Sequence, residues 1–121
     1  MAGQHEEAIE KYNKVIADTP EGNEKLPTFL ANRAHSLISL DRLDEAIADC
    51  TRAEALDPKC LVAYAGHSKA FAYRNKLGPA LDILKKALSK DKENAGLQQK
   101  VAILEGELKL ETLVPKNDPN R

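Results

Sequence analysis

Apolar residues recur three or four positions apart through most of the chain, which is the spacing that lines one face of an α-helix. The clearest stretch covers residues 30–37, breaks at 40–44 and resumes over 46–53. Its apolar positions are Leu30, Ala34, Leu37, Ala46, Cys50 and Ala53. The pattern predicts two helices joined by a short turn. We expect Pro58 to end the second helix, because proline disfavours helix in the residue before it.

The same pattern returns 34 residues later. The matched pairs are Leu30 and Tyr64, Leu37 and Phe71, Ala46 and Ala80, and Ala53 and Ala87. Upstream, Ala8, Tyr12, Val15 and Pro20 precede Ala46, Cys50, Ala53 and Pro58 by 38 residues, one period plus a four-residue insertion within 21–26. A fixed period of this size predicts a stack of identical helical hairpins rather than one closed core.

The repeats predict a single all-α domain over residues 1–113. It divides into a half repeat (1–20), two full repeats (21–60 and 61–93) and a capping helix (94–113). Gly78-Pro79 is expected to mark the turn inside the second full repeat, with the proline in the first turn of the helix. Residues 114–121 contain two prolines and only one apolar residue, so they are predicted to form a disordered tail.

Both ends of the array carry apolar positions that need a partner. The first helix lacks a hairpin partner, so one side of Ala8, Tyr12 and Val15 is expected to be uncovered. In the closing helix, the apolar stripe is expected to pack on the preceding repeat, and the alternative is a dimerisation seam. Ile103 and Leu110 lie off that stripe and form a second apolar face. The stripe consists of Leu97, Val101, Leu104 and Leu108.

Composition narrows the class of protein without naming a function. The net charge is −1 and aromatic residues make up 4% of the chain, so no bias towards nucleic acid or an acidic membrane is present. No apolar run is long enough to cross a membrane, and the first residues lack the apolar core of a signal peptide. Two cysteines at arbitrary spacing do not indicate a disulfide framework. A cytoplasmic protein is the expectation.

Catalytic and metal-binding patterns are missing from the sequence. His5, His35 and His67 fall in three different helices, without the i, i+4 spacing of a zinc helix, and are expected on the surface or in a polar groove. Cys50 occupies a core position, and Cys60 is expected to be half exposed without a nearby base. We therefore expect no enzyme activity, no cofactor and no metal.

Taken together, these residues resemble the tetratricopeptide repeat (TPR) family. Glu45-Ala46-Ile47, Ala53 and Asp57-Pro58 fit its pattern, and the resemblance covers residues 3–113. It implies a right-handed α-α superhelix, a TPR solenoid of about two and a half repeats plus the C-terminal capping helix. It also implies a protein–protein interaction module, since TPR arrays bind peptides in a concave groove lined by the first helix of each repeat.

Within the family, Asn32-Arg33-Ala34 and the segment 44–50 resemble the TPR domains of co-chaperones, including those that also bear a J domain. Carried over by position, the resemblance implies a groove formed by Asn32, His35, Lys69, Tyr73, Gln99 and Lys100. It also places Thr28, Ala31, Val62, Ala65, Gly66 and Ile103 along that groove.

Co-chaperone TPR domains often use a carboxylate clamp, in which lysine, arginine and asparagine side chains bind the C-terminal carboxylate of a heat-shock chaperone. Asn32 matches one clamp asparagine, but Val62 and Gly66 stand where the family has lysine and arginine. Two further clamp positions fall on a first helix that this chain does not contain. Clamp binding is therefore expected to be weak or absent, unless Lys69 and Lys100 compensate.

Two hypotheses follow. The first is a co-chaperone-like adaptor that binds a peptide or partner protein, with a heat-shock chaperone as one candidate and no nucleic acid or membrane involved. The second is a scaffold fragment without clamp activity that completes itself by self-association, as a helix-exchanged or otherwise dimeric homo-oligomer.

Overall fold

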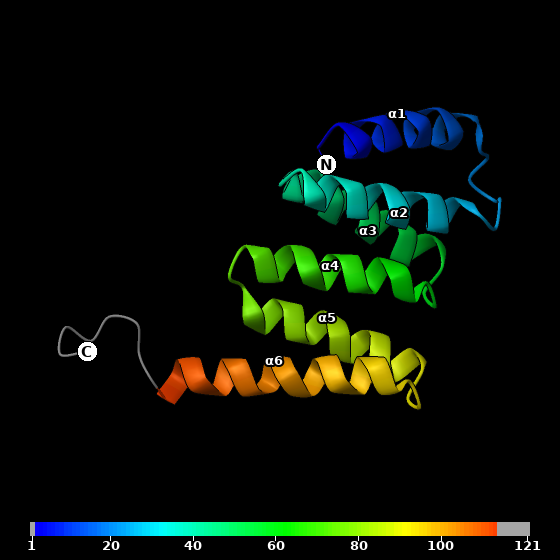
Figure 1. Cartoon of the computed structure of the whole chain (residues 1–121). Coiled ribbons are helices and arrows are strands. Elements are labelled where there is room, and N and C mark those ends of the chain that lie inside the picture. The colour runs from blue at the N-terminus through cyan, green and yellow to red at the C-terminus, as the bar shows by residue number, and fades with distance from the viewer. Residues whose placement is uncertain (1, 114–121) are drawn as a thin grey trace.

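The computed structural model describes residues 2–113, and the predicted tail, 114–121, lies outside the described residues. Within that range the chain forms six α-helices and no strand. The helices are α1 (Ala2–Asp18), α2 (Leu26–Ser39), α3 (Leu43–Leu56), α4 (Leu61–Tyr73), α5 (Leu77–Lys90) and α6 (Ala95–Leu113). They stack one after another from α1 to α6 (Figure 1), with α2 packed on α3 and α4 packed on α5 as two hairpins. The all-α stack expected from the repeat is confirmed.

Both hairpins turn in the same way. Asp41 and Asn75, 34 residues apart, have a φ of 60° at the ends of α2 and α4. Asp and Asn tolerate this left-handed conformation better than most residues do. The next backbone N–H groups, of Arg42 and Lys76, bond five residues back at 2.9 Å, which closes a Schellman motif in each repeat. Asn75 therefore makes the turn that the sequence predicts at Gly78-Pro79.

Gly78 and Pro79 lie instead in the first turn of α5. A proline is tolerated there because the first N–H groups of a helix have no intrahelical partner. The expected place of Pro79 is thus confirmed, and that of Gly78 is wrong. The four-residue insertion lies in the loop before α2, because α2 begins only at Leu26.

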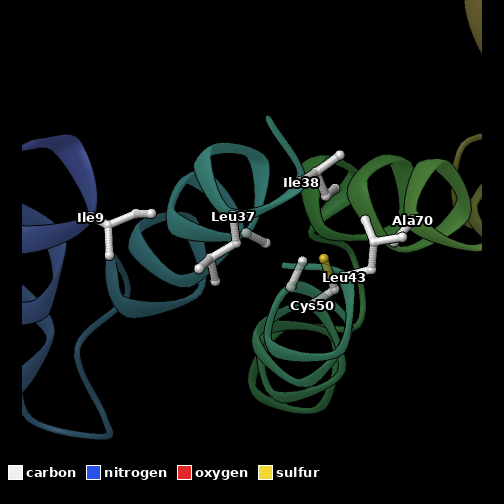
Figure 2. Packing of buried hydrophobic residues seen from close by; sticks show 8 residues of the cluster. Ile9, Leu37, Ile38, Leu43, Cys50 and Ala70 are labelled. Atoms are coloured by element: carbon white, nitrogen blue, oxygen red, sulfur yellow. The ribbon is translucent and has the colours of Figure 1, made fainter. Parts of the chain in front are cut away.

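Small residues occupy the positions where helix backbones approach closely. Ala34, Ala46, Ala53, Ala80 and Ala87 are all fully buried. Larger side chains fill the space around them, and Figure 2 shows this for the cluster that joins α1 to α4 through residues such as Ile9, Leu37 and Cys50. Each fully buried leucine contributes on the order of 1.5–3 kcal/mol to folding.

The first helix is covered on one side only, because α1 packs against α2 and no other described helix. Val15 is 40% exposed and Ala8 and Tyr12 are half-buried, whereas their counterparts in α3 are fully buried. Those counterparts are Ala46, Cys50 and Ala53. The expected open face of α1 is therefore confirmed.

The closing helix caps the stack. Leu97 and Val101 are buried against Tyr64, Leu81 and Leu84, and Leu104 and Leu108 pack at the edge of the same cluster. Ile103 and Leu110 are 53% and 62% exposed, so the second apolar face predicted for α6 is present.

Candidate functional site

A hollow of about 420 Å³ lies between α2, α4 and α6. The neighbouring first helices α2 and α4 pack together, but no residue of α4 has its Cα within 8 Å of one in α6. The backbone of α6 lies against α5, while Leu97 and Val101 share a cluster with Leu81 and Leu84 of α5 and Tyr64 of α4. The hollow is lined by His35 of α2, Ala65, Ser68, Lys69 and Ala72 of α4, Leu84 of α5, and Lys100, Ile103 and Leu104 of α6.

The charged groups at this hollow are all basic. Lys69 and Lys100 reach it from opposite helices, His35 adds an imidazole, and no acidic side chain is part of the lining. The rest of the lining is alkyl, apart from Ser68, whose hydroxyl donates to the carbonyl of Ala80 at 2.8 Å. Such a surface attracts a ligand that carries an apolar group next to a negative charge.

The surroundings of the hollow lower the pKa of His35. Burial is the largest influence and lowers the pKa of the imidazole, and Lys69 and Lys100 lower it further through charge repulsion. The contact of Nε2 with the Val62 carbonyl oxygen, at 3.4 Å, acts in the opposite direction and is too long to dominate. The ring is therefore neutral near pH 7.

Three of the six predicted groove residues meet at the hollow, namely His35, Lys69 and Lys100. Tyr73 is 59% exposed and lies beside it, with the Lys69 Nζ 5.8 Å from its ring centroid. Half-buried Asn32 and exposed Gln99 are not part of the lining. Whether any of the six contacts a ligand stays a prediction.

The wider groove prediction is partly wrong. Ala65 and Ile103 line the hollow as expected, and Val62 is 43% exposed. Ala31, however, is fully buried in the cluster that includes Ala63 of α4. Successive first helices pack on each other here, so the α2 face turned towards α4 is interior rather than groove.

Sequence reasoning missed Ser68, Ala72, Leu84 and Leu104 as lining residues. A signal for two of them was present. Ala65, Ser68 and Ala72 follow one another at helical spacing around Lys69, and small residues at that spacing leave room on a helix face. Leu104 is expected to pack on the preceding repeat, and Leu84 is not among the residues singled out from the sequence. Both pack in the cluster between α4, α5 and α6 and also line the hollow.

Two further sequence expectations are corrected. His67 is neither on the surface nor in the groove: it is buried, its Nδ1 lies 2.8 Å from Glu54 Oε2, and it stacks on Phe71. Cys60 is 8% exposed rather than half exposed. Burial raises the pKa of its thiol, and raises the pKa of Cys50 to about 12, so both stay protonated and unreactive.

Neither a metal cluster nor a membrane span emerges from residues 2–113. No three His, Cys, Asp or Glu side chains in that range are placed to hold an ion together. None of the six helices combines the length and the apolar character that a bilayer crossing requires.

Known proteins resemble the chain in both sequence and fold, although no protein-family model matches it. It is 32% identical to mouse sperm-associated antigen 1 and 31% identical to the DnaJ homolog subfamily C member 7 homolog of Schizosaccharomyces pombe. These matches cover 89% and 88% of this chain but only 11% and 22% of the relatives, so the chain spans a small part of their length.

Several solved structures share the fold, among them two with bound peptides. The first TPR domain of Spaghetti (RPAP3), bound to the HSP90 peptide SRMEEVD, has a TM-score of 0.75 at 26% identity, covering 88% of this chain and 81% of that one. The second TPR domain of human RPAP3, in complex with the HSP70 peptide SGPTIEEVD, has a TM-score of 0.72 at 28% identity, covering 85% and 82%. The chain belongs to the TPR family. The superhelix expected for such a solenoid is thereby confirmed for this TPR domain.

In a TPR domain with a carboxylate clamp, basic side chains would stand at positions 62 and 66. This TPR domain has an exposed valine and a buried glycine there. A Cβ at Gly66 would lie 3.1 Å from the Sγ of Cys50 and 3.4 Å from Nε2 of His35. The second position is therefore filled by neighbours, and the basic groups of the groove lie further along, at the hollow.

Proposed function

We propose that this TPR domain is a non-catalytic adaptor that binds a peptide segment of a partner protein in the groove between α2, α4 and α6. The observation that carries the proposal is the hollow itself, an open apolar cavity with Lys69 and Lys100 on it and no acidic residue in its lining. Non-catalytic peptide binding also fits the buried, protonated thiols.

The acidic C-terminal tails of heat-shock chaperones are the first ligand class to consider, which would make the domain co-chaperone-like. Two neighbours in fold carry such peptides, and each peptide joins an apolar residue to a run of acidic ones. Exposed lysine side chains next to an apolar surface are suited to such carboxylates. A cytoplasmic location is part of this proposal, because these chaperone partners are expected there.

The test is fluorescence anisotropy with labelled SGPTIEEVD at low and moderate salt. Saturable binding that weakens with salt and drops in Lys69→Gln and Lys100→Gln supports the proposal. Lys14→Gln on α1 is the matched control, since it removes the same charge from an exposed site on another helix. No binding to this peptide or to SRMEEVD, by a chain that is folded, contradicts it.

A second candidate function is self-association, and the open face of α1 favours it. The counterparts of Ala8, Tyr12 and Val15 in α3 are fully covered, so an apolar surface that the repeat normally buries stays open here. Analytical ultracentrifugation over a range of protein concentrations distinguishes a monomer from a dimer. A concentration-dependent dimer that is lost in Val15→Glu supports this candidate, and a strict monomer at the highest concentration rejects it.

A further inference from the structure

The basic groups of this groove are displaced from the place where a free C-terminus would be held. By position, the clamp lysine and arginine would be Val62 and Gly66, and neither carries a charge. Of the three clamp positions that fall within this chain only Asn32 keeps the family's residue, and a neutral amide alone neutralises no carboxylate. At these three positions a ligand therefore gains little from ending in a free carboxylate.

The charge is placed instead beside apolar surface. Lys69 and Lys100 share the hollow with the alkyl side chains of Ala65, Ala72 and Ile103. The hollow is near the small end of ligand pockets, which span about 300–1,000 Å³. It thus suits one large side chain of a peptide better than a whole small-molecule ligand.

Neither the two lysines nor the apolar hollow is sufficient alone for tight peptide binding. Exposed lysines pair weakly with carboxylates because water screens them, and a small apolar hollow gains little from an alkyl group without orientation. A ligand that presents an apolar side chain directly before one or two carboxylates uses both at once, since burial of the first holds the second at the ammonium groups.

We propose that the hollow recognises an internal apolar–acidic segment of a peptide, with the apolar side chain in the hollow and the following carboxylates at Lys69 and Lys100. A free C-terminus is not required. This inference rests on the proposed function. A carboxylate clamp binds the C-terminal carboxylate of a partner, whereas this hollow would bind an apolar side chain followed by acidic residues anywhere along a partner chain.

The experiment compares four labelled peptides with the whole chain. They are SGPTIEEVD as the free acid, the same peptide with a C-terminal amide, the same with a glycine-serine-glycine extension, and a version with alanine for isoleucine. The amide and the extended peptide should bind within about twofold of the free acid. The alanine version should lose at least roughly tenfold, because three alkyl carbons are removed and an open hollow buries them only in part.

Variants of the protein test whether the isoleucine side chain of the peptide binds in the hollow. Ala72→Leu fills the hollow from α4 and should weaken the isoleucine peptide much more than the alanine one. Ala102→Leu is the matched control on the exposed side of α6, and circular dichroism confirms that both variants fold. If Ala72→Leu alters the fold, Ile103→Ala, which removes part of the wall from an exposed position, should weaken the isoleucine peptide on its own.

The outcomes separate the two proposals. If no peptide binds, the proposed function and this inference fail together. If the free acid binds but the amide and the extended peptide do not, the domain reads a terminal carboxylate, and the inference fails while the proposed function stands. Equal binding of the isoleucine and alanine peptides would also overturn the inference.

Discussion

Gly66→Ala tests how tightly the groove floor is packed at the missing clamp position. In the interior of an exposed helix this change stabilises a protein by about 1 kcal/mol, because alanine is the better helix former. Here the new Cβ would lie 3.1 Å from the Sγ of Cys50, which is fully buried, and 3.4 Å from Nε2 of His35. His35 can turn towards the groove, but Cys50 cannot move without disturbing the core.

Overpacking of this kind costs about 1–3 kcal/mol, so it outweighs the gain in helix propensity. We expect Gly66→Ala to lower the free energy of unfolding by about 1 kcal/mol. Cys50→Ala removes the conflicting sulfur and should cost about 1 kcal/mol by itself as a small cavity. In the double variant the new methyl group takes the space of the sulfur, so the two changes should couple favourably by about 1–2 kcal/mol.

The assay is urea unfolding of the four proteins, followed by far-UV circular dichroism. The slope m should be the same in all four, which shows that the change is one of stability and not of the unfolded state. Additive effects within about 0.3 kcal/mol would refute the packing argument. So would a Gly66→Ala protein that is more stable than the parent by the full helix-propensity gain.

Three other predictions concern the ion pair of Arg33 with Asp49, helix α1 and His35. Arg33→Ala should destabilise the fold by about 2–4 kcal/mol in thermal or urea unfolding, because it leaves the largely buried Asp49 without its bidentate partner at 2.7 Å; Arg33→Lys should recover part of the loss. Hydrogen exchange should be faster in α1 than in α3, since α1 packs on α2 alone, and equal protection in a monomer would contradict this. Burial and two lysines lower the pKa of His35, so a bound anionic peptide should raise the pKa of His35 and cause proton uptake. Peptide binding should therefore strengthen as the pH falls from 7.5 towards 5.5. His35→Gln should remove that part of the pH dependence.

The helices and their register could be predicted from the sequence because the repeat compares each helix with another copy of itself. The small residues Ala34, Ala46 and Ala80 marked the close contacts, and all three are fully buried. The open face of α1 followed from the same comparison, since Val15 corresponds to Ala53 but none of the helices within residues 2–113 covers it.

The groove was harder to predict, because its shape depends on how whole helices pack. Helical periodicity identifies the face of α2 that meets α3, but it does not show that the neighbouring face meets α4 and buries Ala31. Likewise, periodicity does not show that the backbones of α4 and α6 stay more than 8 Å apart while α6 packs on α5. The buried pair of His67 and Glu54 joins α4 to α3, and no local pattern links those two positions.

The central claim is that the surface between α4 and α6 binds peptides. The most direct test is chemical-shift mapping of the isotope-labelled chain as unlabelled SGPTIEEVD is added. We predict that the largest shifts follow His35, residues 65–72 and residues 100–104, which surround the hollow. Shifts concentrated on α1 or on the outer faces of α3 and α5, or no shifts at all, would contradict the account.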